Sequence, residues 1–342
     1  MSNRVIRSVV SILVVFVLVV SVLSPLLHVE ANSDALSKIH PLLLKKILQS
    51  SGEEIVEIVV RLTPLPREIA QQVKGNYRLA VNALKNWAEI TQIPIVKWIE
   101  QHGGVVLNRF WLDNIILAKL PAKLVVKLAE QPSVVKIFEN FEVKLIEPVN
   151  RKPADVRADQ VSSWGIFKIR ANETWALGIT GEGIRIAVLD TGVDITHPAL
   201  DGKMLSVIPG DPYYPGGWME FDSYGNPIRS TPHDTHGHGT HCSGTALGGD
   251  TEEILIGVAP GATLMHGLVL PGGSGTFAQV IAGMQWAVEP YYLTPEGDRV
   301  YTGLPAQVVS MSWGANEFYG NELLPAIEAM LLANIVPVAA IG

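Results

Sequence analysis

Short apolar runs alternate with segments of helical periodicity between residues 184 and 341, and this alternation limits the fold more than any other feature. The run 184–190 ends in Asp190, and five segments follow it in the order strand, helix, strand, helix, strand: 263–269, 277–288, 307–311, 322–332 and 335–341. Apolar strands that alternate with helices predict a parallel sheet joined by right-handed crossovers. We therefore expect an α/β domain in this half of the chain.

Two residues of this half stand where a catalytic pair is expected. Asp190 closes a buried strand, so its carboxylate would lie at the carboxyl-terminal edge of the sheet, where open α/β sheets keep their sites. His238 lies between two glycines, where a polar loop gives way to small residues, which predicts an imidazole at the start of a tightly packed helix. Such an imidazole can act as a general base, and a carboxylate would fix its tautomer. Taken alone, Asp190 could instead be a turn or capping residue.

Composition excludes several classes of protein. The chain has 342 residues, 48% hydrophobic and 17% charged, which is typical of a protein that forms a core and is long enough for two domains beyond a targeting segment. The net charge of −7 and the absence of a Lys/Arg-rich run argue against a nucleic-acid partner. A single cysteine excludes an internal disulfide framework.

The N-terminus has the layout of a secretory signal peptide. Arg4 and Arg7 precede the apolar run 9–23, and a small-residue cleavage site follows near Ala31. Residues 1–31 therefore predict export and a secreted, extracellular protein. The apolar run is also long enough for an uncleaved membrane anchor, which is the alternative.

Residues 53–148 show a different order of elements. Apolar runs at 54–62, 105–110 and 114–119 predict strands, and 133–146 predicts a last strand and a tail. Helical spacing covers 77–102, where Pro94 is expected to kink or divide the helix, and a second helix is expected from Pro121 to Glu130. The order β-α-β-β-α-β predicts a ferredoxin-like α+β domain, with helices on an antiparallel sheet.

The Asp190 block and the run His236-Gly-His-Gly-Thr-His241 resemble the Asp and His blocks of the subtilisin-like serine proteases, the subtilases of the peptidase S8 family. The resemblance implies a subtilisin-like parallel sheet with helices on both faces over 160–342. It makes Asp190 the triad aspartate and His238 the triad histidine of a serine endopeptidase that hydrolyses peptide bonds in proteins.

The third member of the triad, a serine in a Gly-Thr-Ser setting, does not occur in the sequence, and 336–342 resembles the strand that precedes the oxyanion-hole Asn. We therefore expect the N-terminal part of the peptidase domain, without its serine half and inactive on its own. The alternative is an inactive fragment whose first domain acts as a protease inhibitor or folding helper.

Between a signal peptide and these blocks, 53–148 resembles the inhibitor I9-like propeptide of the family. The resemblance implies a zymogen whose own propeptide is an intramolecular inhibitor and folding helper, with a tail over 138–150 in the active-site cleft and processing between Glu147 and Ser163. The other partners expected are protein or peptide substrates, and the chain is expected to be a monomer. A second domain unrelated to inhibition is the alternative.

Two glycine-containing segments resemble the strand edges between which subtilases hold an extended peptide. They supply the substrate-binding residues that we expect: Gly273, Ser274, Gly275, Ser312, Trp313 and Gly314. Glycine allows close approach, and main-chain hydrogen bonds accept many sequences, so broad specificity follows. Out of this context, either segment would be a surface turn. Ser274 is not expected to be a nucleophile, because it lacks the Gly-x-Ser-x-Gly pattern.

Metal and thiol chemistry are alternatives at the same place. His233, Asp234, His236, His238 and His241 lie close together in the sequence, but not at the spacing usual for zinc, so no metal ligand is assigned. Cys242, four residues after His238, is either a thiol nucleophile or a small buried hydrophobe.

No cofactor is expected to be required, and calcium is kept as a structural ion. Ala199 stands where many subtilases carry a calcium-binding Asp, although the loop 249–253 offers carboxylates. The long segment 204–233 is either a cleft rim or a surface insertion.

Overall fold

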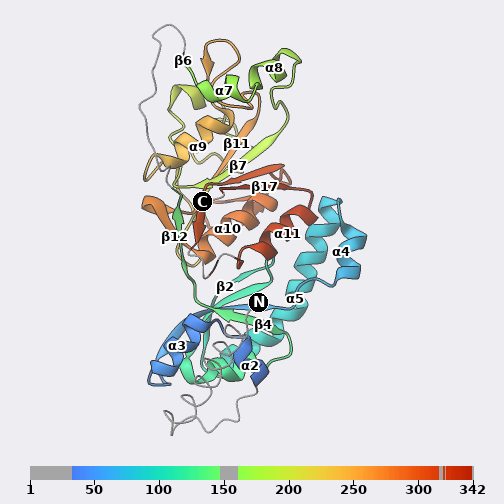
Figure 1. Ribbon diagram of the computed structural model, residues 1–342, viewed down its shortest axis with the longest axis vertical. Helices are drawn as coiled ribbons and strands as arrows, with labels where there is room; N and C mark the ends of the chain where they lie inside the picture. Colours follow the sequence, from blue (N-terminus) through green and yellow to red (C-terminus); the bar gives the residue numbers. More distant parts are fainter. Residues whose placement is uncertain (1–32, 147–160, 316–318, 320, 341–342) are drawn as a thin grey trace, which may run out of the picture.

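The computed structural model describes residues 33–146, 161–315, 319 and 321–340, which form two lobes (Figure 1). We call 33–146 the N-terminal lobe and 161–340 the C-terminal lobe. The predicted signal peptide, the end of the predicted tail and the expected processing region up to residue 160 lie outside the described residues. Among the described residues, no helix has both the length and the apolar character needed to cross a bilayer.

The N-terminal lobe is a four-stranded antiparallel sheet with helices packed on it. Its elements are α2 (Ser33–Ser37), α3 (Pro41–Gln49), β1 (Ile55–Leu62), α4 (Arg67–Val73), α5 (Tyr77–Gln101), β2 (Val105–Phe110), β3 (Ile115–Pro121), η1 (Ala122–Leu124), α6 (Val125–Ala129) and β4 (Val134–Phe138). The strand order is β2-β3-β1-β4, and every neighbouring pair is antiparallel. The ferredoxin-like order predicted from the sequence is thus confirmed.

Two local expectations for this lobe are corrected in part. Helix α5 is not divided at Pro94, which lies on its exposed side, while residues before and after it, Ala88 and Ile95 among them, are buried along one face. Pro121 ends β3 and caps the short 3-10 turn η1, and the α-helical turns of the expected helix begin only at Val125.

The C-terminal lobe is built on a six-stranded sheet of order β17-β15-β7-β11-β8-β9. Its elements are β6 (Val161–Ser162), α7 (Trp164–Lys168), α8 (Ala171–Ala176), β7 (Arg185–Asp190), η2 (Pro198–Leu200), β8 (Trp218–Phe221), β9 (Pro227–Ile228), α9 (His238–Leu247), β10 (Ile254–Leu255), β11 (Thr263–Leu268), η3 (Pro271–Gly273), β12 (Ser274–Thr276), α10 (Phe277–Val288), β13 (Tyr291–Leu293), β14 (Arg299–Tyr301), β15 (Val308–Met311), β16 (Trp313–Ala315), α11 (Leu324–Leu332) and β17 (Val336–Ala339). All pairs are parallel except β8 with β9.

Helices cover both faces of this sheet. Along β7, Ala187 and Leu189 join the apolar cluster that contains α10, whereas Ile186 and Val188 join the cluster that contains Leu247 of α9. Successive side chains of a strand point to opposite faces, so β7 is buried on both sides and its sequence is continuously apolar. The predicted α/β fold is confirmed.

The segment 204–233 was left open between a cleft rim and a surface insertion, and the structure shows a further role. Part of it forms β8, which pairs in parallel with β11 and buries Trp218, Met219 and Phe221. The sequence did not predict this short strand, because Gly, Pro and Tyr residues typical of loops surround it. The segment therefore extends the central sheet.

The two lobes share a core and a small sheet. The chain leaves β4 and forms β5 (Glu142–Leu145), which pairs with β12 on one side and β16 on the other. Phe138 and Phe141 of the N-terminal lobe belong to the same apolar cluster as Phe277 of α10 and Met330 of α11. This continuity fixes β5 against the C-terminal lobe.

Candidate active site

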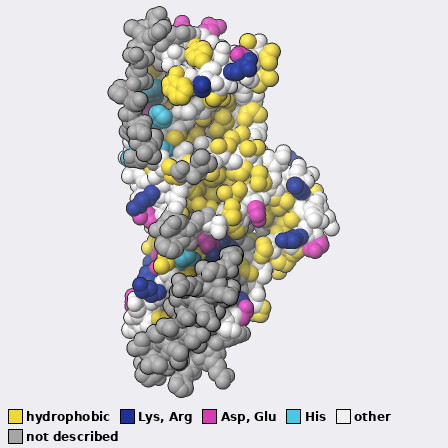
Figure 2. Space-filling model, in the orientation of Figure 1, with side chains coloured by type: hydrophobic (Ala, Val, Ile, Leu, Met, Phe, Trp, Pro, Cys, Tyr) yellow, Lys and Arg dark blue, Asp and Glu magenta, His cyan; other side chains and the backbone are white. Residues whose placement is uncertain are grey.

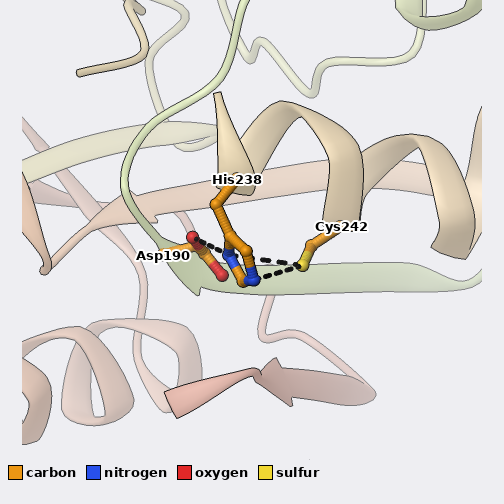
Figure 3. A group of neighbouring side chains, drawn as sticks. All are labelled: Asp190, His238 and Cys242. Atoms are coloured by element: carbon orange, nitrogen blue, oxygen red, sulfur yellow. Dashed lines mark hydrogen bonds and ion pairs between the residues drawn. The ribbon is translucent and has the colours of Figure 1, made fainter. Parts of the chain in front are cut away.

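Asp190 and His238 meet where β7 ends and α9 begins. Asp190 is the last residue of β7 and is fully buried; His238 is the first residue of α9, and its side chain is 13% exposed. His238 Nδ1 lies 2.8 Å from Asp190 Oδ1, and the backbone N–H of Thr191 donates to the same oxygen (Figure 3). Because the carboxylate accepts from Nδ1–H, Nε2 carries the lone pair that can take a proton whenever the ring is in its neutral form.

The carboxylate also changes the acidity of the imidazole. The hydrogen bond to Asp190, with a second contribution from Cys242, raises the pKa of His238 to about 10 against the opposing effect of burial. The protonated ring is therefore stabilised, and this is the form that a general base takes once it has accepted a proton.

Cys242 lies one turn along α9, on the same face as His238. Its Sγ is 3.6 Å from Nδ1 and 3.8 Å from Nε2 of that histidine (Figure 3), and the residue is only partly buried. Burial raises the pKa of the Cys242 thiol, but hydrogen bonds with His238, His241 and Ser312 outweigh it and lower the pKa below its usual value. The thiol thus contacts the candidate base, and Cys242 also packs, partly buried, against the apolar cluster that contains Leu247.

Asp234 positions the start of α9, although its place among the histidines of the sequence indicated only a possible metal ligand. Its carboxylate accepts hydrogen bonds from the backbone N–H groups of His236, Gly237 and Thr240 and from the hydroxyls of Thr191 and Thr240. Burial raises the pKa of Asp234, but these hydrogen bonds outweigh it and lower the pKa to about 2. An aspartate ahead of a glycine and a helix start is a capping signal that could have identified it.

Gly239 allows α9 to approach the loop after β7. Its N–H donates to Thr191 Oγ1, and a Cβ at this position would lie 2.1 Å from the carbonyl oxygen of Gly192. The glycine after His238 is therefore required by the contact that brings His238 to Asp190.

His266 is a buried imidazole on β11, next to the strand that ends in Asp190, and no sequence motif predicted its role. It is fully buried on β11, its Nδ1 lies 3.2 Å from Ser243 Oγ of α9, and its ring stacks near Trp218. Burial lowers its pKa to about 4, so the ring is neutral at neutral pH. It packs beneath α9 without adding a charge next to Asp190.

The six expected substrate-binding residues all lie along β5. Ser274 and Gly275 on β12 pair with Lys144 and Val143, and Trp313 and Gly314 on β16 pair with Leu145 and Lys144. Of the other two, Gly273 lies against the Leu145 side chain and the carbonyl of Ser312 accepts the N–H of Ile146. The indole of Trp313 points inward and donates to the carbonyl of Leu189. Both strand edges therefore already hold an extended segment of this chain.

Among the described residues, one group offers a metal-binding set. Ligand atoms of Asp190, His238 and Cys242 lie within 4.8 Å of one another, whereas His233, Asp234, His236 and His241 are not brought together as ligands. In the loop proposed for calcium, Asp250 Oδ1 accepts three backbone N–H groups, those of Glu252, Glu253 and Ile254. That oxygen is therefore already hydrogen-bonded to the backbone of its own loop.

Comparison with known proteins identifies relatives of this site. Residues 181–342 match the family model described as the subtilase family, Peptidase_S8. The chain is similar to bacillopeptidase F of Bacillus subtilis, with 28% identity over 268 residues, which are 75% of this chain and 18% of the relative. It is also similar to the minor extracellular protease Vpr of the same organism, with 36% identity over 175 residues, which are 50% of this chain and 21% of the relative. It is also similar to subtilisin E of Bacillus subtilis, with 31% identity over 191 residues, 56% of this chain and 43% of the relative.

A solved structure shows the same fold. The crystal structure of fervidolysin from Fervidobacterium pennivorans, described as a keratinolytic enzyme related to subtilisin, matches with a TM-score of 0.50 and 22% identity over 85% of this chain and 40% of its own. The chain spans less than half the length of each of these relatives.

Proposed function

We propose that this chain, whose residues 181–342 match the model of the subtilase family, is part of the precursor of a serine endopeptidase that hydrolyses peptide bonds in proteins. One observation carries the proposal: the hydrogen-bonded pair of Asp190 and His238 lies beside a cleft whose two strand edges hold an extended peptide segment.

In the proposed reaction His238 Nε2 takes the proton of a serine hydroxyl while the serine oxygen bonds to the substrate carbonyl carbon. The same proton then passes to the amine that leaves, and water releases the acyl group in a second cycle. Asp190 keeps the ring oriented and stabilises the imidazolium. Thr191 and Asp234 act as positioning residues, because they hold the loop after β7 to the start of α9.

We place the nucleophilic serine and an oxyanion donor outside the described residues, because no serine hydroxyl in the part of the chain that the structure describes is hydrogen-bonded to His238. Exposed apolar side chains at the sheet edge support this placement: Leu324 and Leu331 on α11, and Val336 and Val338 on β17, are about half exposed. Figure 2 shows hydrophobic side chains on the face where these elements lie. Edge strands with such surfaces are normally covered.

The N-terminal lobe is proposed to inhibit the site in the precursor. The pairing of β5 between β12 and β16 supports this role, because a substrate would need the same two edges. Residues 1–31 are proposed to direct export, in keeping with the relative named as an extracellular protease.

The proposal is tested by expressing the coding sequence with the codons that follow Gly342 and measuring casein hydrolysis and labelling by a serine-directed fluorophosphonate. Asp190→Asn should lower kcat by about 10⁴-fold and His238→Ala by at least as much. Asp298→Asn, in an exposed loop, is the matched control and should leave activity unchanged. An active extended protein that tolerates His238→Ala would contradict the proposal.

The contact between Cys242 and His238 supports one second candidate, a thiol hydrolase within the 342 residues. It predicts peptide hydrolysis by the purified chain that is lost on Cys242→Ala and on alkylation with iodoacetamide. An inactive 342-residue chain, with activity that appears only in the extended protein and survives Cys242→Ala, rules this candidate out.

A further inference from the structure

The C-terminal lobe contains a cavity of about 340 Å³ at the β9 edge of the central sheet. One wall comes from the segment 208–230 around β8 and β9, and the other comes from 292–296 in the hairpin of β13 and β14. The residues that line it are distinct from the Asp190–His238 pair and from the expected substrate-binding residues. Its size falls within the range of about 300–1,000 Å³ that is typical of small-molecule sites.

The floor of this cavity is apolar. Trp218 and Met219 are buried beneath it, and the indole N–H of Trp218 donates to Ser230 Oγ, so the floor keeps no unsatisfied donor of its own there. Ile208 and Ile228 line the cavity and are 42% and 39% exposed. Apolar side chains gathered in a hollow with a polar rim are typical of ligand-binding grooves.

The rim carries charged groups of both signs. The guanidinium carbon of Arg229 lies 3.5 Å from the centre of the Tyr213 ring, and among the described residues Arg229 forms no ion pair. On the opposite wall, Glu296 has neither an ion pair nor a hydrogen bond within the described part of the chain. Asp211 Oδ1 accepts the N–H of Tyr213, which leaves its second oxygen as an acceptor. The rim therefore offers donors and acceptors to a ligand.

Two tyrosines complete the walls. Tyr213 and Tyr292 are both partly exposed, and each brings an aromatic ring together with a hydroxyl that can donate and accept. The turn of the hairpin that carries Tyr292 is closed by hydrogen bonds from the N–H of Thr294 to the carbonyl of Asp298 and from the N–H of Gly297 to the carbonyl of Thr294. This wall is therefore formed before a ligand enters.

We propose that this cavity binds a neutral sugar, with one face of the pyranose ring against Tyr292 and its hydroxyls hydrogen-bonded to Arg229 and Glu296. A pyranose ring presents C–H groups on its face and hydroxyls at its edge, each of which donates and accepts. It thus fits an aromatic wall and apolar floor below a rim with donors and acceptors.

The charges of the rim disfavour a charged ligand. An anion would meet the carboxylates of Asp211 and Glu296, and a cation would meet the guanidinium of Arg229. The neutral ligand avoids both repulsions and still gains hydrogen bonds to charged groups, which are the stronger kind. The inference is independent of the proposed function, because it concerns a separate site and a different class of ligand.

The test is saturation-transfer NMR on the 342-residue chain with the methyl glycosides of glucose, galactose and mannose at millimolar concentration. At least one should receive saturation, and the charged sugars glucuronate and glucosamine should bind about tenfold more weakly or worse. A trisaccharide of the sugar that binds distinguishes two sources of the ligand. Equal affinity indicates a free monosaccharide, and clearly higher affinity indicates a glycan or polysaccharide.

Two variants connect binding to this cavity. Glu296→Ala removes a charged acceptor and Tyr292→Ala removes a ring face, so each should weaken sugar binding by about tenfold or more. Asp298→Asn is the matched control, since Asp298 lies in the same turn but outside the lining residues, and it should leave binding unchanged. Glu296 is exposed, so Glu296→Ala still tests the proposal if Tyr292→Ala fails to fold, as judged by amide exchange of β7 and β11.

Three results would overturn the proposal: no saturation transfer to any neutral sugar, a preference for a charged sugar, or unchanged sugar binding in the folded Glu296 and Tyr292 variants. Because every readout is binding by the 342-residue chain, the test is separate from the activity test of the proposed function.

Discussion

At the scale of single residues, the acidity of His238 depends mainly on one neighbour. The Asp190 hydrogen bond is the largest cause of its raised pKa of about 10, and Cys242 adds to it. We expect NMR titration to show His238 losing its proton well above pH 6.5. Asp190→Asn should lower the pKa by more than Cys242→Ala does. A titration of His238 below pH 6.5, or one that Asp190→Asn leaves unchanged, would contradict this account.

The raised pKa of His238 also makes the stability of the folded state depend on pH. Since the pKa of His238 is higher in the folded state, its contribution is complete below pH 6.5 and is lost as the pH rises toward about 10.

His266 is expected to act in the opposite direction. Burial lowers its pKa to about 4, so the folded state binds fewer protons than the unfolded chain between pH 4 and 6.5. Stability should therefore be complete above pH 6.5 and fall on acidification to pH 4, by on the order of 3 kcal/mol. His266→Leu should flatten that part of the stability curve, as measured by urea denaturation at each pH. An unchanged slope would show that His266 does not carry this dependence.

These residues also show what the sequence could and could not reveal. Asp190 and His238 were predicted because each ends or begins an element with an evident pattern. Asp234 and His266 were missed as supporting residues because their partners, Thr191 and Ser243 among them, come from other segments and are brought near only by the fold.

At the scale of elements, the contact between α9 and the loop after β7 depends on Gly239. An added Cβ would lie 2.1 Å from Gly192 O and 3.0 Å from His266 Cε1, so Gly239→Ala must move the helix. We expect a loss of about 1–3 kcal/mol of stability and of the downfield Nδ1–H signal of His238.

Gly244→Ala is the matched control on the same helix. The nearest atom to its Cβ would be Ile256 Cδ1 at 3.9 Å, and alanine favours a helix interior by roughly 0.5–1 kcal/mol over glycine. This variant should keep the His238 signal and gain stability in thermal denaturation. Equal behaviour of the two variants would refute the proposed close contact at Gly239.

Elements with a clear sequence pattern were predicted, and elements with a weak sequence pattern were not. The segment 277–288 is the helix α10, which begins at a capping box formed by Thr276 and Gln279 and contains no proline, and almost all of its residues are buried. Strand β8 was not predicted, since only four residues form it and its place in the sheet is set by pairing with β11, more than 40 residues away. Such pairings are decided by tertiary contacts rather than local propensity.

At the scale of the whole molecule, a buried ion network joins the lobes. Arg61 on β1 binds Asp113 through two nitrogens and Glu322, just before α11, through a third contact of 2.5 Å. Lys136 on β4 binds the other carboxylate oxygen of Glu322. The side chains of Arg61, Asp113 and Glu322 are each less than a tenth exposed. Nothing in the order of the sequence predicted this network, because it joins positions up to 261 residues apart.

Removing Glu322 should therefore loosen the lobes. Glu322→Ala leaves the buried charge of Arg61 short of one partner, and loss of one member of a buried pair costs about 3–5 kcal/mol. The matched control is Glu289→Ala, which breaks the more exposed pair with Lys85 across the same interface and should cost about 1 kcal/mol or less. Urea denaturation should show a large shift for the first variant and a small one for the second, and limited proteolysis should cut between the lobes faster only in the first. If both variants lost the same small amount of stability, the shared apolar cluster of Phe138, Phe141 and Phe277, rather than the ion network, would be what holds the N-terminal lobe over the site.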